Sequence, residues 1–463
     1  MNIGRGPNQV QPQWASIQAS SASAASDAAA APARQGHAGA GGDAGVTYNP
    51  DSLATIRSCP PSSLKPLNPQ LALLQPYPFE RLRQLFAGVT PSAASPPINL
   101  SIGEPRHPTP QFIRDALAAG SAGLSNYPIT AGVPALREAI AAWLIRRHRL
   151  AALDAMSQVL PVLGSREALF AFAQTVVDPS RVGATVIVPN PFYQIYEGAT
   201  LLAGATPHYV SSLAANSFAP PWREVSATVW ARTQLVYVCS PDNPTGRVAT
   251  EDEWRTLFEL SDRHGFVIAS DECYSEIYCD EARPPLGALA AAAALGRDDF
   301  PRLVVFGSLS KRSNCPGLRS GYVAGDASLI KSFLLYRTYH GSAMSPAVAA
   351  ASIAAWSDEA HVRVNRALYA QKFATLAPKV DAVLAAPRPE AAFYLWANVG
   401  GDDADFARRL YADQAVSVLP GSYLGRTVGG VNPGAGYVRI ALVAQFEECA
   451  EAIDRLVRFA GAE

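Results

Sequence analysis

The sequence predicts an α/β protein with a large, mostly parallel sheet covered by helices and a second, smaller α+β domain. Between about residues 100 and 345, short apolar runs such as "ATVIVP", "QLVYVC" and "RLVVFG" alternate with helical stretches such as "EDEWRTLFELSDRHG". Runs that are apolar along most of their length indicate strands covered on both faces. After Pro346 the sequence becomes Ala-rich and helical to about residue 384, and shorter strand-like runs such as "YVRIAL" follow. With 463 residues, 49% of them hydrophobic, the chain is long enough for two cores.

The predicted organisation has four parts. Residues 1–63 are rich in Ala, Ser, Gly, Gln and Pro and offer few large apolar side chains, so we expect a disordered tail there. Residues 64–99 are expected to form an N-terminal arm and part of the small domain. The large domain is expected at 100–345 and the small C-terminal domain at 346–463.

Composition narrows the class of partner. Lys and Arg total 38 against 39 for Asp and Glu, which gives no general reason to expect nucleic acid or an anionic membrane. The six cysteines show no paired spacing and the seven histidines are scattered, so we expect reduced thiols and no metal site. No signal peptide or membrane-length apolar run is visible, which favours the cytoplasm. Small-molecule partners are the better expectation.

Ligands of an open α/β sheet collect beyond the carboxyl ends of its strands, so the residues that follow each predicted strand are the candidates for a site. The segment "LGSREAL" places Gly164, Ser165 and Arg166 where a helix begins. Free backbone N–H groups and the helix dipole at such a position hold an anion, here a phosphate. Taken alone, a Gly-Ser pair at a helix start is usually only a boundary signal.

Two further strand ends carry polar side chains. "CSPDNPTG" presents Asn243 in a turn fixed by Pro and Gly, and "ASDECY" presents Asp271 and Tyr274. Each has an ordinary explanation as a turn residue or a helix cap. Their occurrence at successive strand ends makes a shared site the better interpretation.

Lys311 is the lysine whose position is unusual. It follows the apolar run "LVVF" in "GSLSKRSNCPGLRSG", together with Ser308, Ser310 and Arg319. The remaining lysines lie beside the tail or in helical patterns where a solvated face is the ordinary explanation: Lys65, Lys331, Lys372 and Lys379. Two hydroxyls, an amine and an arginine at one strand end suit a phosphorylated ligand that condenses with an amine. Pyridoxal 5′-phosphate fits that description.

These motifs resemble the fold-type I pyridoxal-phosphate enzymes, specifically the class I/II aminotransferases of the aspartate aminotransferase family. The resemblance runs from about residue 65 to the C-terminus. It implies that Lys311 is the Schiff-base and proton-transfer residue and that Asp271 is the partner of the pyridinium nitrogen. It further implies that Tyr274 and Asn243 hydrogen-bond the ring oxygen and that Tyr193 of "NPFYQIYE" stacks on the ring. The phosphate ligands it implies are Gly164, Ser165, Arg166, Ser308, Ser310 and Arg319.

Two more segments match the same family. "NYPITAGVPALRE" implies that Tyr127 reaches the phosphate of a neighbouring subunit, and hence that the protein is a homodimer with shared sites. "GYVRIAL" implies that Arg439 clamps the substrate α-carboxylate, with Gly103 of "SIGEP" and Asn243 beside it.

Within the family, "SLSKRSNCPGLRSGYVAGD" is most similar to the succinyldiaminopimelate transaminases of bacterial lysine biosynthesis. Such substrates carry distant carboxylates, so a second cationic anchor is expected. Arg312 is the first candidate for this anchor because it directly follows Lys311, and Arg106 and Arg337 are the next candidates. An ordinary surface charge explains each of the three about as well.

Three other functions stay open at this point. An aspartate- or alanine-type aminotransferase and a β-eliminating C–S lyase of the same fold would both keep Lys311 and Asp271. A transcription regulator with an aminotransferase-like sensor domain would need a basic DNA-binding module, for which residues 1–63 have neither the charge nor the apolar periodicity.

Overall fold

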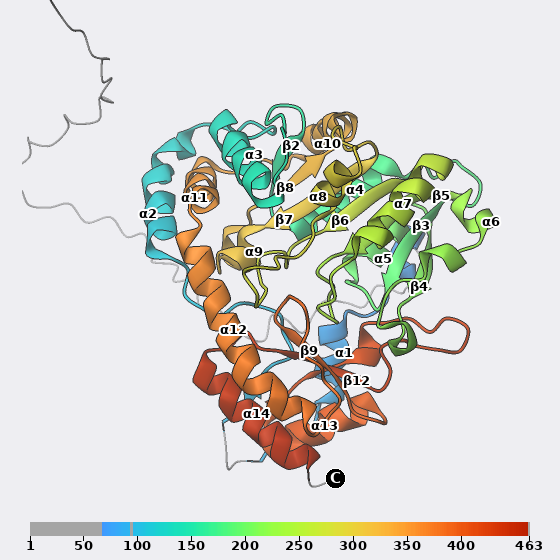
Figure 1. Cartoon of the computed structure of the whole chain (residues 1–463), viewed down its shortest axis with the longest axis vertical. Helices are drawn as coiled ribbons and strands as arrows, with labels where there is room; N and C mark the ends of the chain where they lie inside the picture. Colours follow the sequence, from blue (N-terminus) through green and yellow to red (C-terminus); the bar gives the residue numbers. More distant parts are fainter. Residues whose placement is uncertain (1–66, 93–95, 462–463) are drawn as a thin grey trace, which may run out of the picture. The chain divides into compact units, whose positions relative to one another are not determined.

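A seven-stranded sheet lies at the centre of the described chain (Figure 1). The computed structural model describes residues 67–92 and 96–461, so the tail expected at 1–63 lies outside the described residues. The strand order is β2-β8-β7-β6-β5-β3-β4. The strands span β2 (Val159–Val162), β3 (Thr185–Asn190), β4 (Thr206–Ser211), β5 (Thr233–Cys239), β6 (Val267–Asp271), β7 (Leu303–Ser308) and β8 (Gly321–Gly325).

The prediction of a mostly parallel sheet is confirmed. The pairs β3–β4, β3–β5, β5–β6 and β6–β7 are parallel, whereas β8 runs antiparallel to both β7 and β2. An antiparallel neighbour needs no crossover helix, and the short α9 (Leu309–Arg312) and η6 (Pro316–Leu318) turn the chain back at the same sheet edge. The carboxyl ends of β5, β6 and β7 therefore lie side by side at one edge.

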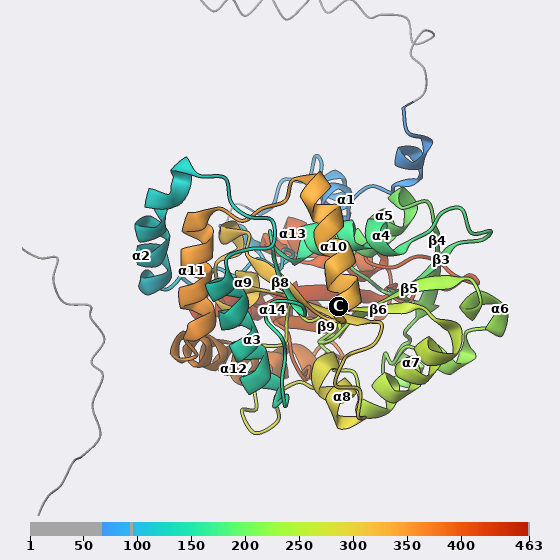
Figure 2. The ribbon, with the colours of Figure 1, turned by 90° about the horizontal axis from the view of Figure 1, so that it is seen from above.

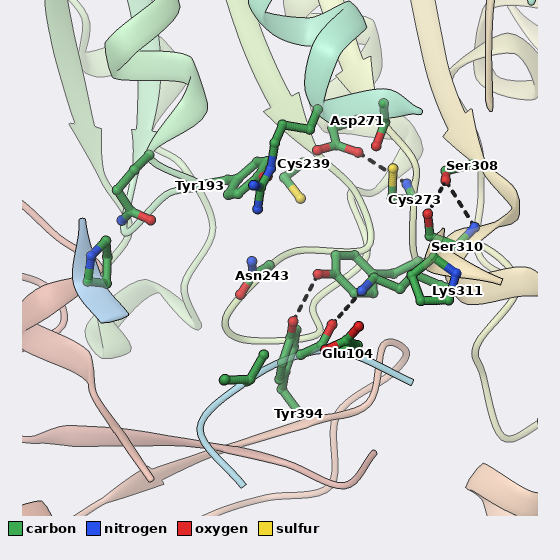
Figure 3. A pocket seen from close by; sticks show the side chains of 18 of the residues that line it. Glu104, Tyr193, Cys239, Asn243, Asp271, Cys273, Ser308, Ser310, Lys311 and Tyr394 are labelled. Carbon is green, nitrogen blue, oxygen red and sulfur yellow. Dashed lines mark hydrogen bonds between the residues drawn. The ribbon is translucent and has the colours of Figure 1, made fainter. Parts of the chain in front are cut away.

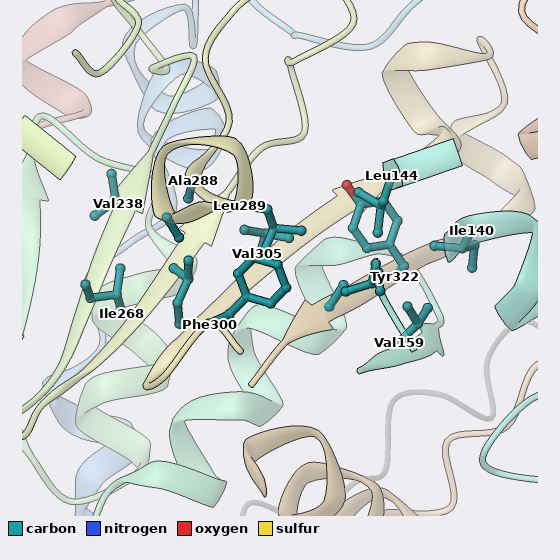
Figure 4. Close-up of a cluster of buried hydrophobic side chains, with 14 of the residues drawn as sticks. Ile140, Leu144, Val159, Val238, Ile268, Ala288, Leu289, Phe300, Val305 and Tyr322 are labelled. Atoms are coloured by element: carbon teal, nitrogen blue, oxygen red, sulfur yellow. The ribbon is translucent and has the colours of Figure 1, made fainter. Parts of the chain in front are cut away.

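Helices cover both faces of this sheet, which explains why its strands are apolar at almost every position. Neighbouring residues of one strand belong to different cores: Val304 packs with one face and Val305 with the other. Figure 4 shows Val305 with Ile268 and Leu289 in the first core. Figure 2 shows α4 and α5 on one side of the strands and α7 and α8 on the other.

The first core is covered by α3 (Pro134–His148), α7 (Glu251–His264), α8 (Ala288–Ala294) and α11 (Pro346–Ser357). The second is covered by α4 (Ser165–Val176), α5 (Ile195–Leu202) and α10 (Ala327–His340). The helix α11 begins at the expected domain boundary of 346, yet Ala351 and Trp356 of α11 lie in the core of the large sheet. It also packs against α2 (Gln111–Ala119) and η3 (Gly120–Ser125).

Capping residues in the sequence account for several helix ends. Thr250 accepts from the backbone N–H of Glu253, whose side chain returns to the N–H of Thr250, so a capping box starts α7. Gly265 ends the same helix at φ +78°, a conformation that glycine adopts without strain. Asp326 caps α10 by accepting from two backbone N–H groups.

A smaller α+β layer follows along the chain. Its three-stranded antiparallel sheet has the order β11-β12-β9, and β1 pairs in parallel with β10. These strands are β1 (Ile98–Asn99), β9 (Tyr394–Asn398), β10 (Val416–Ser417), β11 (Leu419–Pro420) and β12 (Tyr437–Ala441). The helices packed there are α12 (Ala360–Asp381), α13 (Asp403–Gln414) and α14 (Phe446–Ala460).

The remaining described elements are short. They are η2 (Pro69–Leu73), α1 (Pro78–Leu85), η4 (Ala214–Asn216), η5 (Trp222–Glu224), α6 (Ala227–Trp230) and η7 (Gly421–Tyr423). Within residues 67–92 and 96–461, no helix combines the length and the apolar character that a membrane crossing requires.

Candidate active site

A cavity of about 520 Å³ lies beyond the carboxyl ends of β5, β6 and β7 (Figure 3). The large sheet supplies one wall, and Tyr394 of β9 and Arg439 of β12 supply another. Tyr77 and Phe79, at the start of α1, also line it. The cavity therefore collects residues from the N-terminal segment, the large sheet and the small sheet.

Lys311 lies on the cavity wall in α9, directly after β7. Its Nζ donates a hydrogen bond to the carbonyl oxygen of Gly103 and lies 5.3 Å from the ring centre of Phe393. Removal from water, more than any neighbouring charge, lowers the pKa of Lys311 to about 8. A larger share of neutral amine at neutral pH makes this side chain a better nucleophile and base than an exposed lysine.

Asp271 ends β6 and is buried. Its Oδ2 accepts a 2.7 Å hydrogen bond from the hydroxyl of Tyr196, and its Oδ1 accepts one of 3.2 Å from the N–H of Cys273. Burial raises the pKa of Asp271, and these hydrogen bonds and the charge of Lys311 act in the opposite direction. The carboxylate is thus held by donors on both oxygens while it faces the cavity.

An anion cradle lies where α4 and α9 begin. Ser308 Oγ lies 2.7 Å from Ser310 Oγ, and it also accepts from the N–H of Ser310. Gly164 sits against Arg319, because a Cβ atom at position 164 would lie 2.2 Å from a guanidinium nitrogen of Arg319. Ser165 and Arg166 line the same cavity. Hydroxyls, free helix N–H groups and a guanidinium are the donor set that a phosphate requires.

Aromatic and amide side chains form the middle of the cavity. The hydroxyl of Tyr193 accepts a 2.6 Å hydrogen bond from Nε of Arg166. Tyr274 and Tyr394 join their hydroxyls at 2.9 Å. Asn243 accepts a 2.8 Å bond from Arg439 through its carbonyl oxygen, which leaves its amide N–H groups available to a ligand oxygen.

Arg439 is a buried cation whose hydrogen-bonding capacity is only partly used. Its side chain is 3% exposed, and its Nη1 and Nη2 donate to Asn243 and to the carbonyl oxygen of Ser101, at 2.8 Å each. Within the described chain its Nε has no partner, and the two partners of the guanidinium are an amide and a carbonyl oxygen and not a carboxylate. A buried charge normally needs a counter-ion, so a ligand carboxylate fits here. Gly103 lines the same cavity and leaves space for the side chain of Tyr394, since a Cβ at position 103 would lie 2.0 Å from the hydroxyl oxygen of Tyr394.

The structure thus brings most of the predicted site residues to one cavity. Those that line it are Gly103, Ser165, Arg166, Tyr193, Asn243, Asp271, Tyr274, Ser308, Ser310, Lys311, Arg319 and Arg439. Gly164 lies just behind Arg319. Tyr127 does not line the cavity, and its side chain is fully exposed.

Arg312 is a correction to the expected distal anchor. Its side chain is 2% exposed and donates to Glu359 and to the carbonyl oxygen of Ala355. Its guanidinium also packs on the rings of Trp143 and Trp356. Adjacent residues of a helical turn point in different directions, so Arg312 faces the protein interior while Lys311 faces the cavity.

The other two candidate anchors are also occupied elsewhere. Arg106 pairs with Glu448 at 2.9 Å, and Arg337 pairs with Glu167 at 2.6 Å. Neither lines the cavity.

Sequence patterns missed several residues around the site. Lys372, expected on a solvated helix face, is only 1% exposed and donates to His107 at 2.7 Å and to the carbonyl oxygens of Leu442 and Ala444. The sequence also did not single out three tyrosines as site residues, because a tyrosine in an apolar stretch usually indicates only core packing. They are Tyr77, Tyr196 and Tyr394.

Comparison with known proteins gives one consistent result. The family model "Aminotransferase class I and II" matches residues 95–456. An LL-diaminopimelate aminotransferase of Desulforudis audaxviator is 33% identical over 390 residues, which cover 83% of this chain and 95% of that protein. The crystal structure of an aminotransferase from Neisseria meningitidis is 54% identical, with a TM-score of 0.82, and covers 85% of this chain and 100% of that one. The structure of the aminotransferase AspB from Helicobacter pylori is 36% identical, with a TM-score of 0.78, and covers 84% of this chain and 100% of that one.

Proposed function

Because the chain belongs to the class I and II aminotransferases, whose members use pyridoxal 5′-phosphate, we propose that it is the aminotransferase of a diaminopimelate-type substrate. In the proposed reaction L-glutamate and N-succinyl-2-amino-6-oxopimelate give 2-oxoglutarate and N-succinyl-LL-2,6-diaminopimelate. The similarity of "SLSKRSNCPGLRSGYVAGD" to the succinyldiaminopimelate transaminases supports the succinylated acceptor. The relative from Desulforudis audaxviator is named for LL-diaminopimelate, which is the same carbon skeleton without the succinyl group.

One observation carries this proposal: a lysine amine, a buried carboxylate and a buried arginine face the same cavity. These are Lys311, Asp271 and Arg439. The cradle of Ser308, Ser310 and Arg319 would hold the phosphate of the cofactor, and Lys311 would hold its aldehyde carbon. When bound, pyridoxal phosphate supplies an electron sink for negative charge that develops next to the substrate amino group.

The side chains of this cavity then have separate tasks. Arg439 binds the α-carboxylate through its planar guanidinium and so orients the bond from Cα to its hydrogen. The amine of Lys311 would act as the base that takes the proton from the substrate Cα and as the acid that returns one. Asp271 would keep a proton on the ring nitrogen, and the two hydrogen bonds that its carboxylate accepts fix its orientation. Tyr193 would pack on the ring face.

We propose in addition that two copies of the chain pair. Tyr127 is fully exposed, and its neighbours Leu124 and Ile129 are 64% and 61% exposed. Three large apolar side chains on one short exposed segment favour contact with another protein surface. Light scattering should give twice the monomer mass. The variant Tyr127→Phe should bind pyridoxal phosphate more weakly than the unmodified enzyme. An enzyme that is active as a monomer would contradict this pairing.

Two experiments test the proposed function. Borohydride reduction of the loaded enzyme followed by peptide mapping should mark Lys311, and Lys311→Ala should abolish turnover while the fold is kept. A mark on another lysine would overturn the assignment.

A panel of acceptors with glutamate as donor tests the substrate. It should contain N-succinyl-2-amino-6-oxopimelate, oxaloacetate, pyruvate and acetylornithine semialdehyde. The highest kcat/KM is expected for the succinylated acceptor. Release of pyruvate and ammonia from cystathionine, without amino transfer from glutamate, would instead indicate a lyase.

A further inference from the structure

A second cavity, of about 480 Å³, lies next to the active site and has no part in the chemistry described above. It is lined by Gln75, Pro76, Arg81, Gln84, Ser422, Gly425, Arg426, Thr427 and Asn432. The same two chain segments bound both cavities. Tyr77 and Phe79 face the active site while Arg81 faces the second cavity, and Leu424 faces the active site while Gly425 faces the second.

Among the described residues, Arg81 forms no ion pair within 4 Å. Its guanidinium carbon lies 3.8 Å from the ring centre of Tyr423, and no hydrogen bond or ion pair joins it to any other residue of the described chain. Partial burial is the main cause that lowers the pKa of Arg81, and the charge of Arg426 acts in the same direction, whereas Tyr423 and Asp403 act in the opposite direction. The nearby Asp403 is buried and already accepts from the N–H of Ser422 at 2.6 Å.

Arg426 provides the contrast within the same cavity. Its guanidinium forms a two-pronged pair with Glu197, at 2.8 and 2.6 Å. The other polar lining groups are neutral amides and hydroxyls, and among the described residues no Asp or Glu lines the cavity. One unpaired guanidinium among neutral donors is a site for an anion.

The position of Arg81 is held by packing. The next residue, Leu82, is 6% exposed and packs in one apolar cluster with Leu419 and Leu424. Because Leu82 packs α1 against Leu419 and Leu424, the backbone of the adjacent Arg81 is held beside the second cavity. The contact with the ring of Tyr423 then directs the side chain of Arg81 along the wall of this cavity.

We propose that Arg81 forms a subsite for the distal carboxylate of a dicarboxylic substrate, while Arg439 takes the α-carboxylate. This inference rests on the proposed function, because glutamate and the succinylated acceptor both carry a carboxylate beyond the reacting carbon. It also supplies the second cation that Arg312, Arg106 and Arg337 do not provide. The substrate side chain would pass Tyr77 and Leu424 to reach it.

Arg81→Gln and Arg81→Lys test this subsite in the cofactor-loaded enzyme, with Arg83→Gln as the matched control. Arg83 lies on the same helix, but its side chain is 77% exposed and pairs with Glu80. The probes are glutarate, which has two carboxylates, and butyrate, which has one, each as an inhibitor against glutamate. In Arg81→Gln the inhibition constant of glutarate and the KM of glutamate should each rise about tenfold, the equivalent of about 1.4 kcal/mol. The inhibition constant of butyrate should change by less than about twofold. The inhibition constant of glutarate in Arg81→Lys should lie between those of Arg81→Gln and the unmodified enzyme. Arg83→Gln should have the same constants as the unmodified enzyme.

Each other outcome overturns the subsite. An unchanged constant for glutarate would show that Arg81 does not bind the carboxylate, and equal losses for glutarate and butyrate would show that it only supports α1. Inhibition or activation by glutarate that depends on Arg81 but does not compete with glutamate would assign the cavity to a separate anionic effector. The glutamate measurements do not need the succinylated acceptor, so an enzyme that rejects this acceptor would fail the proposed specificity and still test Arg81.

Discussion

The hydroxyl of Tyr196 donates a 2.7 Å hydrogen bond to Oδ2 of Asp271, and both side chains are buried. Tyr196 itself packs flat against Tyr237, with ring centres 4.7 Å apart and planes inclined by 13°. Burial pushes the pKa of Asp271 upward, and the bond from Tyr196 is one of the few interactions that oppose it. This tyrosine therefore helps to keep Asp271 ionised beside the cavity.

Tyr196→Phe should lower kcat with glutamate by roughly tenfold, because hydrogen bonds to charged groups contribute about 1.5–3 kcal/mol. Loss of this donor raises the pKa of Asp271 further, so the acid limb of the kcat profile should move to higher pH. Tyr237→Phe is the control, since the Tyr237 hydroxyl donates only to the carbonyl oxygen of Leu169, at 2.8 Å. If both variants lost activity equally without a shift of the acid limb, the stacked pair would matter only for packing.

Gly164→Ala should raise the dissociation constant of pyridoxal phosphate by more than about tenfold. The added Cβ would lie 2.2 Å from a guanidinium nitrogen of Arg319, so Arg319 must leave the anion cradle. Spectral titration of the apoenzyme measures the effect.

Gly265→Ala is the control for an alanine placed at a positive φ away from the cavity. Gly265 also has a positive φ, +78°, but its ψ of 14° is left-handed helical, whereas Gly164 has a ψ of 155°. A Cβ at position 265 would meet no atom of the described chain within 4 Å. Gly265→Ala should therefore destabilise the protein by about 1 kcal/mol without changing cofactor affinity. Equal cofactor affinities for the two variants would remove the role given to Arg319.

Sequence patterns predicted the sheet well, because strands buried on both faces are apolar along their length and stand out from amphipathic helices. The same reasoning located Asp271 and Lys311 at the cavity, since residues that follow parallel strands meet at one sheet edge. It failed where function depends on side-chain direction or on contacts between distant segments. Arg312 follows Lys311 in the chain but faces Glu359, and Arg81 reaches its cavity only because α1 packs beside Tyr423. No local pattern contains either fact.

Arg439→Gln should lower kcat/KM for all amino-acid substrates by roughly 100-fold, about 3 kcal/mol, because every substrate carries an α-carboxylate. The cofactor should stay bound with its normal absorption, since Arg439 contacts Asn243 and Ser101 and not the phosphate cradle. This uniform loss differs from the selective loss expected for Arg81→Gln. Retained kcat/KM for alanine in Arg439→Gln would contradict the role of Arg439.

Glu272→Gln should alter the pH dependence of stability and not the substrate preference. Glu272 is 2% exposed, and its Oε1 accepts from the N–H of Ala288 at 2.7 Å and from Ser270 at 3.1 Å. Its Oε2 has no hydrogen-bond partner among the residues that the structure describes. Burial raises the pKa of Glu272 to about 7 from an ordinary value of 4.5. The folded state therefore holds a proton that the unfolded state releases, so this group favours folding most at low pH and loses that contribution as pH rises through 7.

The neutral amide of Glu272→Gln cannot follow this titration. The free energy of unfolding of the variant, relative to that of the unmodified enzyme, should therefore rise by about 2 kcal/mol between pH 5 and pH 8. Urea unfolding at several pH values measures the difference, and Glu251→Gln, at an exposed position, is the matched control. If stability changed with pH in the same way in Glu272→Gln and in the unmodified enzyme, Glu272 would already be ionised in the folded protein. The charge of Arg147, which lowers the pKa of Glu272, would then outweigh the effect of burial.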